Sequence, residues 1–186
     1  SLDHTVYHCT LGSRHVDIAL DVLSDAVFHS AFEAVEVERE IQVVVEELLR
    51  GRDTPARVVG EMLFRQLYTV HPYGRPVIGQ RETIEAFDRD AILSFFRRWY
   101  RPSNACLVIA GDVDPDDVWP RIEATFGTIG DAGADRPQRP VEPLAEAPRS
   151  EIRRQPIQEG HLMLGWAGPA LESPDTPAVD ILSVVL

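Results

Sequence analysis

The sequence predicts an α+β fold in which packed helices cover a layered antiparallel or mixed sheet. Two kinds of segment predict it: short runs rich in β-branched and aromatic residues, and longer runs with apolar residues at helical spacing. They follow one another in the order strand, several helices, strand, helix, linker, strand, helix. The composition agrees, because 44% of the 186 residues are hydrophobic and 26% are charged, as in a globular chain with a core.

Three segments have the length and composition of strands. Residues 4–11 read HTVYHCTL and are rich in β-branched and aromatic side chains. Residues 105–111 read ACLVIAG, a continuous apolar run that favours a buried strand, and residues 161–168 read HLMLGWAG. We expect these segments to build the sheet. Because Cys9 and Cys106 lie within two of them, we expect both thiols to be buried like small hydrophobic side chains.

Apolar spacing and end signals predict the helices. A Thr-Pro pair and two aspartates precede helical patterns, and such residues are preferred at helix N-termini. The predicted helices lie within residues 14–32 and 38–51, begin after Thr54, Asp88 and Asp114, and end the chain within residues 174–186.

A linker separates two unequal parts of the chain. Residues 128–150 are rich in glycine, proline and alanine, which is typical of a connecting segment. We expect residues 1–127 to be the C-terminal part of a first α+β half, and residues 151–186 to begin a second half. Ser1 is not an initiator Met and the last helix lacks a Gly or Asn cap, so we expect a domain truncated at both ends.

The charge of the chain restricts its partners. The formal net charge is -12, from 18 Lys plus Arg against 30 Asp plus Glu, and we expect no basic cluster to interrupt it. Nucleic acid and anionic membranes are therefore excluded as expected partners. No apolar run approaches the roughly 20 residues that span a bilayer, and the first residues do not resemble a signal peptide. We expect a soluble, cytoplasmic protein.

Two glutamates occupy unusual positions in the helix predicted over residues 38–51. On a wheel at about 100° per residue, the apolar side chains form one arc and most polar side chains lie opposite. The arc holds Val37, Ile41, Val44, Val45 and Leu48, whereas Glu38, Arg39, Gln42 and Glu46 form the outer side. Glu40 and Glu47 stand at the edge of the arc, two turns or about 10 Å apart.

A carboxylate against apolar surface needs a cation, a metal or hydrogen-bond donors. Two interpretations stay open from the residues alone. Both glutamates reach water or pair with an arginine such as Arg50, or one of them, with Glu47 favoured by the wheel, ligates a metal.

The histidines do not complete a metal site. His4 and His8 would stand about 13 Å apart in a strand, which is too far for joint ligation of zinc. His71 lies in a turn and His161 is isolated, and the sequence assigns no role to any of these four residues. The sequence also contains no motif for a catalytic nucleophile with its base, and no phosphate-binding glycine loop.

Five motifs occur along the chain in a fixed order. They are DHTVYH, EREIQVVVEELLRGRDTP, HPYGRPVIG, FFRRWYRPSNACLVIAGDVD and GHLMLGWAGPAL. In this order they resemble the insulinase/pitrilysin family of zinc metallopeptidases, the inverzincins, which include the mitochondrial processing peptidases. The resemblance runs from about residue 1 to the end, and it implies that the expected α+β fold is a metallopeptidase domain.

The resemblance implies a zinc-dependent endopeptidase that hydrolyses extended peptides or small proteins through a metal-bound water. In the family, an H-x-x-E-H motif supplies two His ligands and a Glu general base, and a downstream helix supplies a third ligand, a Glu. The resemblance places that ligand at Glu47, and it places at Glu40 an acid that holds the ligand geometry. It also implies Zn²⁺ as cofactor, a peptide as substrate, and a second similar domain, in the same chain or in a homo- or heterodimer, that closes as a clamshell.

The chain departs from the family at one point. It contains no H-x-x-E-H, and the family places that motif roughly seventy residues before the ligand Glu, whereas only 46 residues precede Glu47. We therefore expect the general base upstream of Ser1, no catalytic residue within this chain, and no peptidase activity from this chain alone. The alternative is a non-catalytic partner subunit of the same family, with a substrate-binding or structural role.

Overall fold

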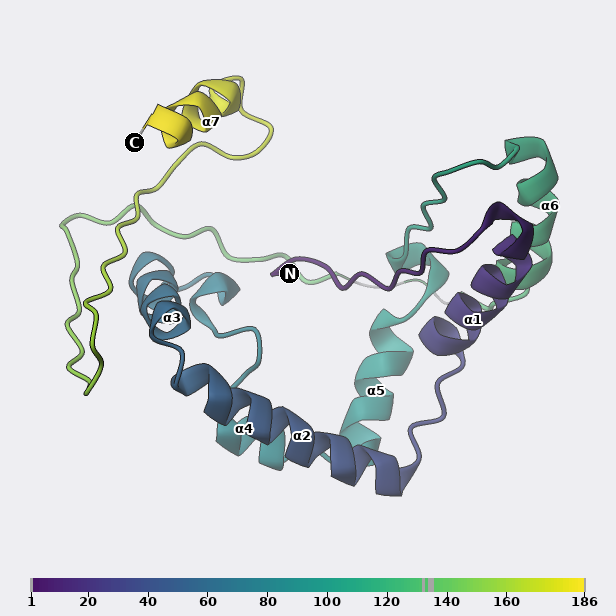
Figure 1. Cartoon of the computed structure of the whole chain (residues 1–186), viewed down its shortest axis with the longest axis horizontal. Coiled ribbons are helices and arrows are strands. Elements are labelled where there is room, and N and C mark those ends of the chain that lie inside the picture. The colour runs from purple at the N-terminus through teal and green to yellow at the C-terminus, as the bar shows by residue number, and fades with distance from the viewer. Residues whose placement is uncertain (1, 132, 134–135, 186) are drawn as a thin grey trace. The chain divides into compact units, whose positions relative to one another are not determined.

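The computed structural model describes residues 2–131, 133 and 136–185 (Figure 1). All regular structure in these residues is helical, with seven α-helices and three short 3-10 helices. The chain divides into two compact units, of which the first joins Ser1–Glu46 to Gln80–Pro137 and the second joins Glu47–Gly79 to Gln138–Leu186. None of the described helices has both the length and the apolar character needed to cross a membrane.

The predicted α+β fold with a layered sheet is wrong for the described residues. Residues 4–11, 105–111 and 161–168 are neither helical nor paired as strands. β-branched composition favours an extended backbone, but a strand exists only where its N–H and C=O groups bond to a neighbouring strand. The prediction that Cys9 and Cys106 are buried is also wrong, because both cysteines are exposed.

In the first unit, the core lies between α1 (Val16–Phe28) and α6 (Pro115–Phe126), which run side by side in Figure 1. Leu20 is only 2% exposed and packs with Val16 and with Val118 of α6. The edge-to-face ring pair of Phe28 and Phe126 and the ion pair between Arg121 and Asp17 also join the two helices. Partly buried apolar side chains close the cluster: Ile109, Val113, Ile122 and Phe126.

The predicted helix caps in this unit are confirmed. The Asp88 carboxylate accepts a hydrogen bond of 2.7 Å from the N–H of Ala91 at the start of α5 (Arg89–Trp99). The Asp114 carboxylate likewise accepts from the N–H of Asp116, 2.9 Å away, at the start of α6. Such bonds satisfy N–H groups that have no partner within the helix. The short helices of this unit are η1 (Ser13–His15), α4 (Arg81–Glu85) and η3 (Pro102–Asn104).

Helix α2 (Ala34–Arg52) is a single 19-residue helix whose residues belong to both units. The predicted core-facing arc is confirmed: Val37 is 7% exposed, and Val45 and Leu48 are each 5% exposed. The four residues predicted for the outer side are all exposed. The apolar period of the sequence therefore sets the orientation of this helix about its axis.

In the second unit, α3 (Pro55–Leu67) begins after Thr54 as predicted and is followed by η2 (Pro72–Gly74). The segment after the linker approaches α3 closely, since a Cβ added to Gly165 would lie 2.9 Å from Cδ1 of Leu67. Two glutamates also contact this region: Glu142 binds the loop after α3, and Glu151 forms an ion pair of 2.6 Å with Arg65. The predicted final helix is present as α7 (Thr176–Val185).

Candidate functional site

Glu40 and Glu47, the site residues predicted from the sequence, both lie on α2. Because the helix is unbroken between them, they stand two turns or about 10 Å apart on one stripe. Both side chains are exposed, and Val43, between them on that side of the helix, is 57% exposed. The buried Val45 and Leu48 fix the rotation of the helix that presents this stripe.

Neither carboxylate is neutralised by a described residue. Within the described ranges, no ion pair or hydrogen bond is formed by the side chain of Glu40 or Glu47, so the predicted alternative of a pair with Arg50 is not seen. Other helical glutamates do find an arginine one turn away: Glu36 with Arg39, Glu61 with Arg57, and Glu85 with Arg81. The two site glutamates keep their oxygens available.

The described residues do not bring together the donors of a complete zinc site. Zinc in proteins takes at least three nitrogen, oxygen or sulfur ligands. No group of three or more His, Cys, Asp and Glu side chains that could hold a metal ion is found in the part of the chain that the structure describes. Among the described residues, Glu47 therefore has no partner ligands beside it, and no catalytic step is assigned to these residues.

The histidines left without a role by the sequence are placed as follows. Nδ1 of His71 accepts a hydrogen bond of 3.3 Å from the N–H of Tyr73, and the two rings form an edge-to-face contact. His4 and His8 lie exposed in the non-helical residues 4–11, and His161 lies exposed in the non-helical residues 161–168. His71 therefore has a local structural role as a cap of η2.

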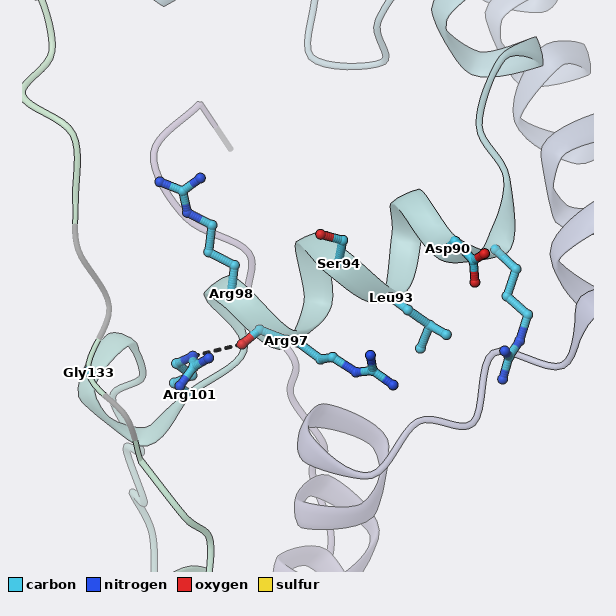
Figure 2. A pocket seen from close by; sticks show the side chains of 8 residues that line it. Asp90, Leu93, Ser94, Arg97, Arg98, Arg101 and Gly133 are labelled. Atoms are coloured by element: carbon cyan, nitrogen blue, oxygen red, sulfur yellow. Dashed lines mark hydrogen bonds between the residues drawn. The ribbon is translucent and has the colours of Figure 1, made fainter.

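A second feature, absent from the sequence-based site, is a pocket of ≈ 710 Å³ along α5. We call it the arginine pocket (Figure 2), and it is lined by Arg89, Asp90, Leu93, Ser94, Arg97, Arg98, Arg101 and Gly133. The expectation that no basic cluster interrupts the acidic chain is therefore wrong. The sequence does contain this cluster, as four arginines within residues 89–101, but the net charge of the whole chain does not reveal it.

A carboxylate is bound by backbone N–H groups in the second unit. The Glu142 side chain accepts hydrogen bonds from three consecutive N–H groups, those of Thr69, Val70 and His71, at 2.8, 2.8 and 2.7 Å. The Thr69 hydroxyl adds a fourth bond of 2.7 Å. Chiefly through the bond from His71, these donors lower the pKa of Glu142 to about 2.

Two family models match the chain. The model described as insulinase (peptidase family M16) matches residues 1–81, and the model described as the peptidase M16 inactive domain matches residues 86–186.

Curated relatives give the same family. An uncharacterized zinc protease of Bacillus subtilis is 31% identical over 172 residues, which are 90% of this chain and 40% of that protein. An uncharacterized zinc protease of Mycobacterium leprae is 28% identical over 186 residues, covering 99% of this chain and 42% of that protein. The chain thus spans well under half of each of these relatives.

Solved structures are similar as well. The ferredoxin protease FusC, in complex with Arabidopsis ferredoxin, superposes with a TM-score of 0.64 at 27% identity, covering 72% of this chain and 15% of that chain. An M16-like peptidase of Alicyclobacillus acidocaldarius superposes with a TM-score of 0.63 at 27% identity, covering 71% of this chain and 31% of that chain.

Proposed function

The chain belongs to the insulinase (M16) family of peptidases, and from this premise we propose that the whole protein is a zinc-dependent endopeptidase. Its substrates are extended peptides or small proteins. The observation that carries the proposal is the exposed, unpaired carboxylate of Glu47 on α2. The resemblance to the family assigns this residue as the downstream zinc ligand. The relatives named zinc proteases support the same metal.

Glu47 would supply one oxygen ligand to zinc. A glutamate suits this role because zinc accepts carboxylate oxygen beside histidine nitrogen. Helix α2 fixes its position, since Val45 and Leu48 on either side of it in the sequence are almost completely buried. A ligand on a packed helix is held more precisely than one on a loop.

Glu40 would act on the geometry and charge of the site without binding the metal. It is two turns from Glu47 on the same stripe, and its carboxylate can accept a hydrogen bond from a ligand histidine. A second negative charge at this distance also favours a bound cation.

Zinc supplies Lewis acidity for peptide-bond hydrolysis when it is bound. The remaining ligands and the general base belong to the H-x-x-E-H motif, which the proposal places in the whole protein outside this chain. The complex of FusC with ferredoxin supports a small protein as a substrate of the kind proposed.

The test is hydrolysis of internally quenched peptides by the full-length protein. We expect cleavage that a zinc chelator abolishes and added Zn²⁺ restores, while the 186-residue chain alone cleaves nothing. Cleavage that survives chelation would contradict the proposal, and so would cleavage by the 186-residue chain with no further sequence.

The second candidate is a non-catalytic subunit that binds peptide or stabilises an active partner. One observation favours it: residues 86–186 match a model that describes an inactive domain. A full-length protein that binds peptide but neither retains zinc nor cleaves would support this candidate over the first. The presence of H-x-x-E-H in the full-length sequence would favour the enzyme.

A further inference from the structure

We propose that the arginine pocket on α5 binds an acidic segment of the peptide substrate, an inference that rests on the proposed peptidase function. The pocket is formed entirely by residues of the first unit. The proposed ligand is a run of Asp or Glu residues in the substrate, at some distance along the peptide from the bond that is cleaved.

The charge of the pocket is opposite to that of the chain. The net charge is -12, yet four guanidinium groups line this one pocket and Asp90 is the only acid in its lining. Like charges gathered at one place repel one another, so the arrangement is stabilised when an anion enters. The favourable interaction of cations with a helix C-terminus accounts for Arg97 and Arg98 in the last turn of α5, but not for Arg89 at its first residue.

Two of the arginines are anchored by backbone carbonyl groups. Nε of Arg89 donates to the carbonyl oxygen of Phe32 at 2.6 Å, and Nε of Arg101 donates to the carbonyl oxygen of Arg97 at 2.7 Å, the bond dashed in Figure 2. A carbonyl oxygen carries no net charge, so neither bond compensates the charge of its guanidinium. The Asp131 carboxylate does interact electrostatically with Arg101, and Arg89 forms no ion pair within the described residues. These bonds restrict the side chains before a ligand binds, which lowers the entropic cost of binding.

The other two arginines are available. Arg98 lies over the Trp99 ring, with its central carbon 5.0 Å from the ring centroid. Arg97 forms no side-chain ion pair within the described residues. Figure 2 shows Arg97, Arg98 and Arg101 at the end of α5 opposite Asp90, so the acid of the lining stands apart from this group of cations.

The chemistry favours carboxylates on a peptide. A guanidinium presents a planar pair of N–H donors that matches a carboxylate, and the sequence uses arginine in place of lysine throughout, since it contains no lysine. The volume of ≈ 710 Å³ lies within the usual range for ligand pockets and accommodates a few side chains. The pocket therefore fits a short acidic stretch.

The experiment measures binding and cleavage with the full-length protein. Two fluorescent peptides share one scissile core, and one carries a tetraglutamate tail where the other carries tetraglutamine. By fluorescence anisotropy we expect the acidic peptide to bind at least about fivefold more tightly, with the preference reduced by added salt. The double variant Arg97→Gln/Arg98→Gln should lose the preference and raise KM for the acidic peptide alone.

Matched controls separate this site from general electrostatics. Arg153→Gln/Arg154→Gln removes the same charge from another exposed adjacent pair and should keep the preference. Arg97→Lys/Arg98→Lys keeps the charge and should retain part of the preference, which shows that substitution at these two positions does not by itself prevent folding. Equal preference in the wild type and the Gln pair, or equal loss in both Gln pairs, would overturn the proposal.

Two further outcomes are decisive. Displacement of the acidic peptide by millimolar inorganic phosphate would mean a general anion site and would also overturn it. If the protein cleaves neither peptide but anisotropy still shows the preference and its loss, the peptidase proposal fails while the pocket is supported. If it cleaves both peptides without preference, the pocket proposal fails alone.

Discussion

The carboxylate of Glu142 is held by the backbone N–H of His71, 2.7 Å from it, in a set of four hydrogen bonds. Glu142 lies in the segment predicted to be a linker, and His71 begins the motif HPYGRPVIG. A carboxylate that binds consecutive N–H groups makes strong, charge-assisted hydrogen bonds. The segment around Glu142 is therefore fastened to the loop after α3, within the second unit.

Replacing Glu142 by Gln should release this contact. The side chain of glutamine is neutral and has only one oxygen that can accept hydrogen bonds, so it cannot replace the carboxylate at all four donors. We therefore expect faster hydrogen exchange at the backbone N–H groups of Thr69, Val70 and His71. Glu146→Gln, an exposed substitution four residues along the linker, is the control and should leave exchange unchanged. Unchanged exchange in both variants would contradict the contact.

The same carboxylate should make stability depend on acid pH. Hydrogen bonds hold its pKa at about 2 in the folded chain, below the ordinary value of 4.5. A lowered pKa in the folded state contributes stability that is present above about pH 4.5 and is lost as the pH falls toward about 2. In acid unfolding followed by circular dichroism, Glu142→Gln should remove this part of the pH dependence. An NMR titration in which the side-chain carboxyl carbon of Glu142 titrates near pH 4.5 would contradict this prediction.

Tyr100 should ionise only in strong alkali. Burial, and then the hydrogen bond of 2.7 Å with the hydroxyl of Tyr7, raise the pKa of Tyr100 to about 12. The neutral form is favoured in the folded state, so this contribution to stability is present below pH 10 and lost as the pH rises toward about 12. In NMR titration of labelled tyrosine, Tyr7→Phe should lower the pKa of Tyr100 without restoring the ordinary value, because burial is the larger cause. An unchanged pKa in that variant would contradict the role of Tyr7.

The core between α1 and α6 should depend on Leu20. Truncation to Ala at this 2% exposed position should lower the free energy of unfolding by about 2–5 kcal/mol, since it removes apolar contacts and leaves a cavity. Val22→Ala, at a 54% exposed position of the same helix, should change it by less than about 0.5 kcal/mol. Urea unfolding measures both, and equal losses would show that the core lies elsewhere.

The helices could be predicted because their signals are local. Asp88 and Asp114 cap the helices that follow them, and the apolar period of residues 37–48 placed Val37, Val45 and Leu48 in the interior. The sheet could not be predicted correctly, because β-branched runs such as residues 105–111 show a preference for extended backbone but not whether a partner strand lies beside them.

Part of the candidate site could also be predicted from the sequence, because that part depends on local signals. A helical wheel finds the stripe that holds Glu40 and Glu47, because that geometry depends on one helix alone. The contact of Glu142 with His71 joins residues far apart in the sequence, so no local sequence pattern predicts it. Identifying the arginine pocket required both the clustering of arginines in the sequence and the surface of the folded chain.

The most direct test of the account is the zinc content of the full-length protein, measured by mass spectrometry after dialysis. We predict one zinc per chain in the wild type and in Glu46→Gln, because Glu46 lies on the exposed outer side of α2, and a loss of most bound zinc in Glu47→Gln. Full zinc in Glu47→Gln together with its loss in Glu46→Gln would contradict the assignment of Glu47 as a ligand.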